Sequence, residues 1–120
     1  MKSIIVTFLA SLLITSAMAA TDEQHYIATT ADGKNKYDLT ISSTQFSWKG
    51  LAGVDKGLFG SDKCKHQQLG DTIDVVQWKG TKYHTFNTLI IDQSNLKFVY
   101  SSLEKKQTIL DNGTLEKVAS

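Results

Sequence analysis

Apolar and polar residues alternate with a period of two along most of this chain, in short runs separated by turn-forming residues. Tyr37, Leu39 and Ile41 alternate with polar residues, and Phe46 and Trp48 continue the pattern. Successive side chains of a strand point to opposite faces of a sheet, so this period predicts half-buried strands. After residue 25, no segment keeps an apolar stripe at the helical period of about 3.6 residues over three turns. The sequence therefore predicts an all-β protein.

The alternating runs predict a sheet of seven or eight strands. Nine runs, the shortest of three residues, lie at residues 26–30, 37–42, 45–48, 64–69, 72–79, 82–92, 96–103, 108–110 and 114–118, and we expect seven or eight of them to form strands. Asp32-Gly33 and Asn112-Gly113 are expected to form hairpin turns, because these dipeptides tolerate the positive φ that such turns require. Residues 50–63 contain four glycines and little alternation, so we expect a flexible loop there.

Short connections between these runs predict antiparallel strands that are neighbours both in sequence and in space. About a hundred residues of this kind can close into a small barrel or pair into a sandwich. We expect the up-and-down barrel, because closure removes exposed strand edges and leaves room for a ligand.

The first twenty residues have the pattern of a secretory signal peptide. A positive start is followed by an apolar run over residues 4–14, and the small residues Ala17 and Ala19 occupy positions −3 and −1 of a cleavage site. The apolar run is shorter than the roughly 20 residues that span a bilayer. We therefore predict a signal peptide at residues 1–19 and a single β-barrel domain at residues 20–120. The mature protein is expected to be periplasmic or secreted, without a membrane anchor.

The charge of the predicted mature chain argues against nucleic acid as a partner. All 13 cations of the full chain are lysines, and loss of Lys2 with the signal peptide leaves 12 of them against 12 acidic residues. A protein that binds nucleic acid needs an excess of cations to displace the counterions of the phosphates. The chain also lacks Arg, the side chain that holds phosphate or carboxylate in a bidentate fork.

Cys64 is the only cysteine, so the chain has no internal disulfide. Its neighbours Lys63 and Lys65 are charged, and we expect a partly exposed thiol that could link two copies in an oxidising compartment. Cys64 and His66 are two residues apart, which places them on one side of a strand. With His84 they could form part of a soft-metal site, or His66 could activate the thiolate. Such pairs are common by chance, so we expect an inert thiol, no metal and no cofactor.

The aromatic residues on the predicted strands point to a pocket. The phenylalanines expected in the core are Phe46, Phe86 and Phe98. Trp48, Trp78 and Tyr100 carry polar atoms that need partners when buried, so we expect them to line the mouth of a cavity. His84 is expected on the same strand face as Phe86, where it would add a polar group to that pocket. The predicted ligand-binding residues are therefore Trp48, Trp78, His84 and Tyr100.

A series of strand-end motifs runs through residues 36–118. In order they are Phe46-Ser47-Trp48 before a Gly-rich loop, Val75-Val76-Gln77-Trp78, Leu89-Ile90-Ile91-Asp92, Leu96-Lys97-Phe98-Val99-Tyr100-Ser101 and Gly113-Thr114-Leu115-Glu116. This order resembles a family of small lipocalin-like barrels related to the carboxy-terminal half of molybdenum cofactor biosynthesis protein F and, more remotely, to phenolic acid decarboxylases. Lys79 departs from the family, in which an acidic residue often follows the second Trp. The resemblance implies a calycin-like fold with a central pocket and carries no activity across.

Catalysis is not the favoured hypothesis. Asp92 could act as an acid or base, but an Asp before Gln-Ser-Asn more often begins a turn. A decarboxylase like those of the remote relatives would need a cluster of Tyr and Glu, and the glutamates of the mature chain lie near its ends at Glu23, Glu104 and Glu116.

Two functions are therefore carried forward. The first is an exported barrel that binds a small apolar or aromatic molecule without catalysis. The alternative is an exported protein inhibitor or immunity factor that acts on a cell-wall hydrolase through the exposed loop at residues 50–63. Known lysozyme-inhibitor families usually rely on a disulfide, which this chain lacks. This difference makes the inhibitor hypothesis the less favoured of the two.

Overall fold

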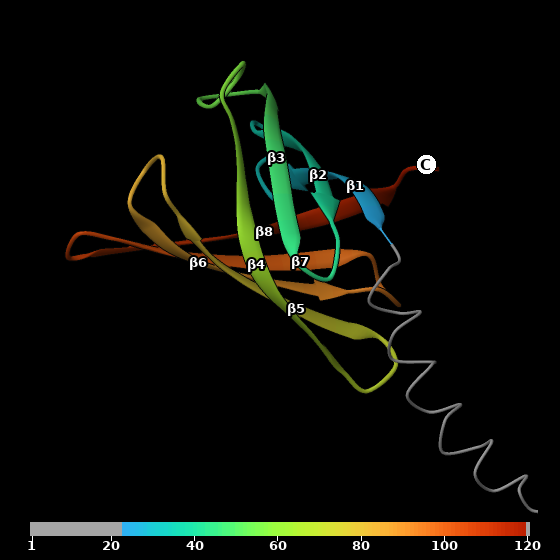
Figure 1. Cartoon of the computed structure of the whole chain (residues 1–120). Coiled ribbons are helices and arrows are strands. Elements are labelled where there is room, and N and C mark those ends of the chain that lie inside the picture. The colour runs from blue at the N-terminus through green and yellow to red at the C-terminus, as the bar shows by residue number, and fades with distance from the viewer. Residues whose placement is uncertain (1–22, 120) are drawn as a thin grey trace, which may run out of the picture.

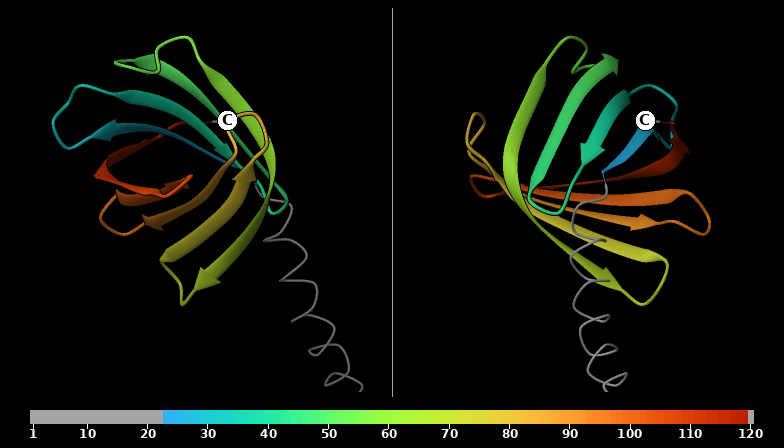
Figure 2. Two further views of the ribbon diagram at one scale, coloured as in Figure 1. Left: turned by 90° about the vertical axis from the view of Figure 1, so that its left-hand side faces the viewer. Right: turned by 45° about the vertical axis from the view of Figure 1, so that its right-hand side comes forward.

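The computed structural model describes residues 23–119, which form a closed barrel of eight antiparallel strands (Figure 1). The strands are β1 (Gln24–Thr30), β2 (Lys36–Ile41), β3 (Gln45–Ala52), β4 (Phe59–Leu69), β5 (Ile73–Gly80), β6 (Thr85–Asp92), β7 (Lys97–Glu104) and β8 (Gln107–Lys117). Each strand pairs with the next along the chain, and β8 pairs with β1 to close the ring. Figure 2 shows this ring from two further directions. The predicted all-β, up-and-down barrel is confirmed, with eight strands.

The predicted signal peptide at residues 1–19 lies outside the described residues. Within residues 23–119, the structure contains no helix of the length and hydropathy needed to cross a membrane.

The alternation predicted for β5 and β6 is present, and it decides which side chains fill the barrel. Val76 and Trp78 point inward and are buried, as are Leu89 and Ile91. Phe46 and Phe98 are also buried, as predicted. The inward set of β6 begins with two polar residues, Thr85 and Asn87, which are likewise buried.

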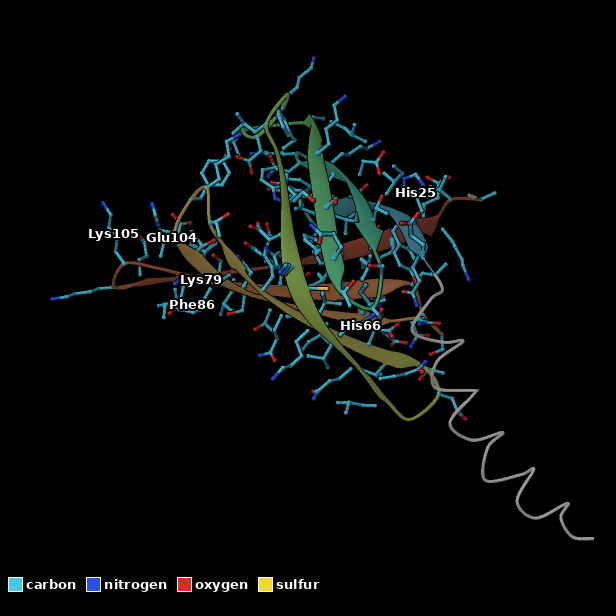
Figure 3. All side chains as sticks on the ribbon, viewed as in Figure 1. His25, His66, Lys79, Phe86, Glu104 and Lys105 are labelled. Carbon is cyan, nitrogen blue, oxygen red and sulfur yellow. The ribbon has the colours of Figure 1, made fainter. Side chains whose placement is uncertain are left out.

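Phe86 was expected in the core, and this prediction is wrong. Its side chain is 60% exposed on the outer face of the barrel, beside Lys79 (Figure 3). Phe86 lies opposite Leu103 of β7 in the register, and the Nζ atom of Lys79 is 5.6 Å from the centroid of its ring. A period of two separates the two faces of a strand but does not say which face turns inward. Here Leu89 and Ile91 bring the face that carries Asn87 into the barrel.

The glycine-rich stretch at residues 50–63 is mostly strand, which corrects the predicted long loop. β3 continues to Ala52 and β4 begins at Phe59, so only residues 53–58 connect them. Gly60 pairs with Trp48 across these strands, and a Cβ atom at this position would lie 2.5 Å from the indole Nε1 atom. This glycine therefore admits the large ring of Trp48 rather than forming a turn.

Asn112-Gly113 is not a hairpin turn but lies inside the continuous strand β8, which corrects a second prediction. The hairpin between β7 and β8 turns at Lys105 and Lys106 instead, where Lys105 has a φ of 52°. Gly113 pairs with Thr30 of β1 and with Phe98 of β7. A Cβ atom there would lie 1.9 Å from the carbonyl oxygen of Thr29. The glycine is therefore required for close backbone approach where the barrel closes. Asp32-Gly33, by contrast, does turn the chain, with a φ of 75° at Gly33.

We expect Gly113→Ala to reduce the free energy of unfolding by about 1–3 kcal/mol, the usual range for overpacking. The new methyl group would meet backbone atoms, which cannot rotate away as a side chain can. Urea denaturation of the purified domain measures the change. Thr114→Ala, one residue further on an exposed position, is the control and should stay within about 0.5 kcal/mol of wild type. Equal stability of the two variants would contradict this account of the closure.

The two ends of the barrel differ. The connections β1–β2, β3–β4, β5–β6 and β7–β8 gather at one end, which we call the mouth, because consecutive strands alternate in direction. The other end, which we call the closed end, is filled by fully buried side chains. They are Tyr26, Ile41, Asp74, Val76 and Ile91. Space for a ligand therefore lies on the side of the mouth.

Candidate ligand-binding cavity

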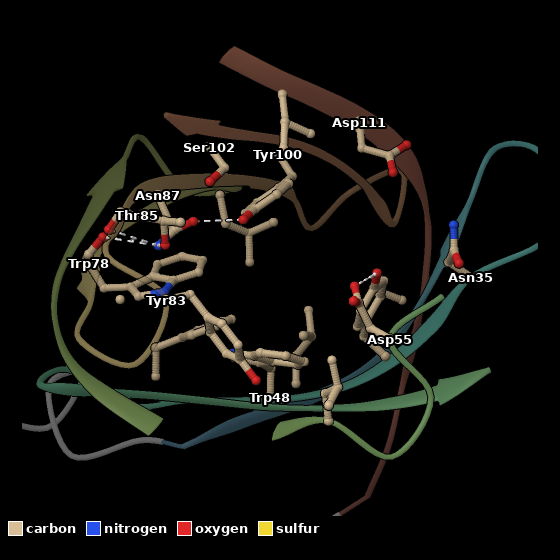
Figure 4. A pocket seen from close by; sticks show the side chains of 18 of the residues that line it. Asn35, Trp48, Asp55, Trp78, Tyr83, Thr85, Asn87, Tyr100, Ser102 and Asp111 are labelled. Carbon is tan, nitrogen blue, oxygen red and sulfur yellow. Dashed lines mark hydrogen bonds between the residues drawn. The ribbon is translucent and has the colours of Figure 1, made fainter. Parts of the chain in front are cut away.

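A cavity of about 480 Å³ occupies the barrel interior and extends to the mouth (Figure 4). Aromatic side chains from β2, β3, β5, β7 and the β5–β6 turn contribute to its wall. They are Tyr37, Phe46, Trp48, Trp78, Tyr83, Phe98 and Tyr100. An eight-stranded barrel has an interior that side chains can just fill or that can hold one small ligand. In this barrel the side chains do not fill the interior.

One wall of the cavity is a stack of three rings around Trp78. The Trp78 ring lies 3.9 Å from that of Phe46 and 6.2 Å from that of Tyr100, measured between centroids, and both pairs are stacked. Trp78 is 8% exposed, so packing against its neighbours covers most of the indole although part of it lines the cavity. Burial raises the pKa of Tyr100 above its usual value.

A second group of rings surrounds Trp48 nearer the mouth. Tyr37 and Tyr83 each lie 6.1 Å from Trp48 between ring centroids, in edge-on and tilted arrangements. Tyr37 reaches this position from β2, and its hydroxyl donates a hydrogen bond of 2.6 Å to Oδ2 of Asp55 in the β3–β4 loop. Burial and this hydrogen bond raise the pKa of Tyr37 well above its usual range. Tyr37 therefore ties the loop to the barrel wall.

A buried polar chain runs along the inner faces of β6 and β7. The Tyr100 hydroxyl donates to Oδ1 of Asn87 at 2.6 Å, and Nδ2 of Asn87 donates to Oγ1 of Thr85 at 2.8 Å. Ser102 follows on the same wall and is 2% exposed; its hydroxyl makes no hydrogen bond of ordinary length in the described residues, and the Tyr100 phenol is its polar neighbour. Buried polar atoms in native proteins nearly always have partners, so Ser102 offers an unused hydrogen-bonding group to the cavity.

Carboxylates form the polar part of the cavity wall near the mouth. They are Asp55, Asp62, Glu104 and Asp111. Asp62 accepts hydrogen bonds from the backbone N–H and the hydroxyl of Thr81. Asp111 lies opposite Tyr100 in the register of β7 and β8. None of the lysines in the described chain belongs to the cavity lining.

His66, labelled in Figure 3, and Asp74 form a pair toward the closed end of the barrel. Neither residue lines the cavity. His66 Nε2 lies 2.9 Å from Oδ1 of Asp74, and Gln93 donates a hydrogen bond to the other oxygen. The hydrogen bond with Asp74 raises the pKa of His66 above its usual value. Burial alone would raise the pKa of Asp74, but its hydrogen bonds with His66 and Gln93 outweigh burial and lower it. The pair holds β4, β5 and the β6–β7 turn together.

Three of the four predicted site residues, Trp48, Trp78 and Tyr100, line the cavity. Trp48 shares a strand face with Phe46, as the alternation predicts, and Trp78 shares one with Val76. Their part in ligand binding stays a prediction.

His84 is not in the cavity, which corrects the fourth assignment. β6 begins at Thr85, and His84 is an exposed turn residue with a φ of 55°. The expected strand at residues 82–92 is therefore three residues too long at its start. Residues 81–84 form the turn between β5 and β6, so the strand alternation does not extend back to His84.

Cys64 and His66 both point to the inner side of β4, as their spacing predicts, and each is partly buried. The Sγ atom lies 3.7 Å from the carbonyl oxygen of Ser42, and burial raises the pKa of the thiol. His66 is engaged with Asp74 rather than with the thiol. Within residues 23–119, no three His, Cys, Asp or Glu side chains are grouped as a metal site would require. A disulfide-linked dimer through Cys64 stays a prediction.

Asp92 begins the β6–β7 turn, as predicted. Its carboxylate accepts hydrogen bonds from the backbone and side chains of Ser94 and Asn95. The bonds from Asn95 and Ser94 lower the pKa of Asp92 to about 2. The carboxylate therefore serves the turn and lies outside the cavity lining.

Sequence reasoning missed the polar residues of the cavity. Asn87 and Thr85 had a signal, because they share a strand face with Leu89 and Ile91, and inward polar residues on such a face often mark a pocket. No sequence signal pointed to Asp55, which lies in the β3–β4 loop. None pointed to Asp111 either, because it precedes Asn112-Gly113, which was expected to be a turn. Glu104 was set aside as a residue near the chain end, but β7 carries it to the mouth.

Residues 21–109 match the MoaF C-terminal domain family. The chain belongs to this family. The match covers most of the barrel and confirms the relation that the strand-end motifs indicate. The departure at Lys79 does not disturb the fold, because that side chain is on the outer face.

Among solved structures, this MoaF C-terminal domain is similar to a protein of Burkholderia vietnamiensis that has been provisionally described as a beta-lactamase. The TM-score is 0.69, and the match covers 79% of this chain and 92% of that chain at 12% sequence identity. At this identity the likeness concerns the fold alone. No curated protein gives a significant match to the sequence.

Proposed function

We propose that this MoaF C-terminal domain is an exported protein that binds a small apolar or aromatic molecule in the barrel cavity without catalysis. The observation that carries the proposal is the cavity itself, with a volume of about 480 Å³ and a wall rich in aromatic rings. Sites for small molecules are typically concave, about 300–1,000 Å³ in volume, and apolar with a few placed polar groups. The export half of the proposal rests on the signal-peptide pattern of residues 1–19.

The barrel supports binding because it holds the cavity open before a ligand arrives. Every strand is hydrogen-bonded on both sides, and the rings that face the cavity pack on one another at fixed distances. A preformed site avoids much of the ordering cost that binding otherwise carries. The non-catalytic half of the proposal is supported by the buried polar chain, in which Asn87 accepts a hydrogen bond from Tyr100 and donates one to Thr85.

The test is titration with the neutral fluorescent probe N-phenyl-1-naphthylamine. We expect saturable 1:1 binding, with probe fluorescence rising and tryptophan emission falling as energy passes from Trp48 and Trp78 to the bound probe. Two substitutions on neighbouring residues give a matched comparison. Ser102→Phe adds a ring inside the cavity and should abolish binding, whereas Leu103→Phe adds one at an exposed position on the outer face and should leave binding unchanged.

Linear, non-saturable fluorescence with the wild-type protein would overturn the proposal. So would equal binding by folded Ser102→Phe and Leu103→Phe, because the probe would then be on the surface. In either case the inhibitor hypothesis would be tested next, through the connection at residues 53–58.

A further inference from the structure

The charges on the cavity wall are of one sign. Four carboxylates line the cavity, and none of the described lysines or histidines does. We infer that the ligand of this cavity is an organic ammonium ion with an apolar or aromatic body. This inference deepens the proposed function and rests on it, because it names the chemical class of the molecule that the cavity binds.

The four carboxylates are not neutralised by the protein. In residues 23–119 the structure contains two ion pairs, His25 with Asp38 and His66 with Asp74, and neither involves a carboxylate of the cavity. Lysines do occur on the connections around the mouth, at Lys34, Lys56, Lys82, Lys105 and Lys106. Lys82 is turned toward other groups, with its Nζ atom 4.5 Å from the centroid of the Phe59 ring. A cationic ligand would therefore find acceptors that are not already paired with a cation.

Asp55 and Asp111 are the carboxylates best placed to hold an ammonium group. Both are partly buried and line the cavity, and in Figure 4 Asp111 extends from β8 and Asp55 from the β3–β4 connection on the opposite wall, in the half of the picture that also holds Asn35. The hydrogen bond from Tyr37 fixes the Asp55 carboxylate, and β8 positions Asp111 across from Tyr100. An ammonium group donates three hydrogen bonds, which suits two carboxylates in one site.

Ser102 is an independent sign that the cavity takes a polar ligand. Its hydroxyl is buried, lies on the cavity wall and makes no hydrogen bond of ordinary length in residues 23–119; its polar neighbour is the Tyr100 phenol, which already donates to Asn87. A buried hydroxyl without a partner costs free energy that a hydrogen bond from a ligand would recover. A purely hydrocarbon ligand would leave both this hydroxyl and the carboxylates desolvated without compensation.

The aromatic part of the wall also favours a cation over an anion. Trp48 and Trp78 line the cavity, and a cation is attracted to the face of such a ring. An anion would meet four carboxylates without a lysine in the lining. The same wall accepts an aromatic ligand body through stacking.

The test compares three molecules that share a naphthalene body and differ in one group. They are 2-naphthylmethylammonium, the neutral 2-naphthylmethanol and the anionic 2-naphthoate, each titrated calorimetrically at pH 7. We expect the ammonium compound to bind at least about tenfold more tightly than the alcohol, because a hydrogen bond to a charged group is worth about one factor of ten or more. The carboxylate should bind most weakly.

Two variants test whether Asp55 and Asp111 cause the preference for the ammonium compound. Asp55→Asn and Asp111→Asn keep the shape of each side chain and remove its charge, and each should lower the affinity for the ammonium compound about tenfold while leaving that for the alcohol unchanged. Asp71→Asn changes an exposed carboxylate in the β4–β5 turn at the closed end and should change neither. With the wild-type protein, raising the salt concentration should weaken binding of the ammonium compound and not of the alcohol. This measurement stands even where a variant does not fold.

The outcomes separate this inference from the proposed function. Equal affinity of wild type for the ammonium compound and the alcohol, or a salt-independent affinity for the ammonium compound, would overturn the inference while N-phenyl-1-naphthylamine still binds. Loss of the preference in Asp71→Asn as well would overturn the assignment to Asp55 and Asp111. Failure of every one of the probes to bind would overturn the proposed function.

Discussion

Trp78→Ala is expected to lower the free energy of unfolding by about 3–5 kcal/mol, the range for removing a large aromatic side chain from a core. The indole is 8% exposed and stacks on Phe46 at 3.9 Å between ring centroids. Its removal would join the space of the side chain to the existing cavity and leave Phe46 without its packing partner. Tyr100 would also lose one neighbour of its ring. Chemical denaturation followed by circular dichroism measures the loss.

The same substitution is expected to weaken binding of N-phenyl-1-naphthylamine, because Trp78 forms part of the cavity wall. Phe86→Ala is a matched control: it removes an aromatic ring from the neighbouring strand, but from the outer face, where the ring is 60% exposed. Its effect on stability should be below about 1 kcal/mol, because most of the ring already contacts water. Binding by Phe86→Ala should equal that of wild type. A larger stability loss in Phe86→Ala than in Trp78→Ala would refute the assignment of inner and outer faces.

Asp74→Ala is the second substitution with a large expected effect. Asp74 is 1% exposed and accepts hydrogen bonds from His66 and Gln93. Removing one partner of a buried charged pair typically costs about 3–5 kcal/mol, because the other partner stays buried without compensation. We expect a loss of this size at pH 5, where both groups are charged.

The loss should depend on pH with a defined sign. The pKa of His66 is raised above its usual 6.5, so its contribution to stability is complete below pH 6.5 and is lost as the pH rises through the folded-state value. The pKa of Asp74 is lowered from 3.8, so its contribution is complete above that value and is lost as the pH falls through the folded-state value. The pair therefore contributes most between about pH 4 and 6.5.

Urea denaturation of wild type and Asp74→Ala at pH 5 and pH 9 measures this dependence. The difference between the two proteins should be larger at pH 5 than at pH 9. Asp71→Ala, in an exposed turn at the same end of the barrel, should differ from wild type by less than about 0.5 kcal/mol at both values. An equal cost of Asp74→Ala at the two pH values would show that the pair contributes through packing rather than through charge.

The polar cavity residues show where local patterns stop being informative. Trp48, Trp78 and Tyr100 could be assigned to a pocket because their strands alternate clearly and their polar atoms need partners. His84 failed because the turn before β6 is longer than the Gly80-Thr81 signal indicates, and turn length is decided by how β5 and β6 meet. Asp55, Asp111 and Tyr37 come from a loop and two distant strands. Their meeting at the mouth depends on the order and stagger of the whole ring.

The alternation of residues along the chain is enough to predict the all-β class, the positions of most strands and the two sets of side chains on each strand, because a strand has a strict period of two. Tertiary structure alone decided which set faces inward, since that depends on which faces bury the most apolar surface once the sheet is closed. Tertiary structure also decided which glycines form turns and which are needed for close contacts between strands. Gly33 is read correctly from its neighbours because it turns the chain locally, whereas Gly60 and Gly113 are required by Trp48 and by the backbone of Thr29, contacts that exist only when distant strands pair.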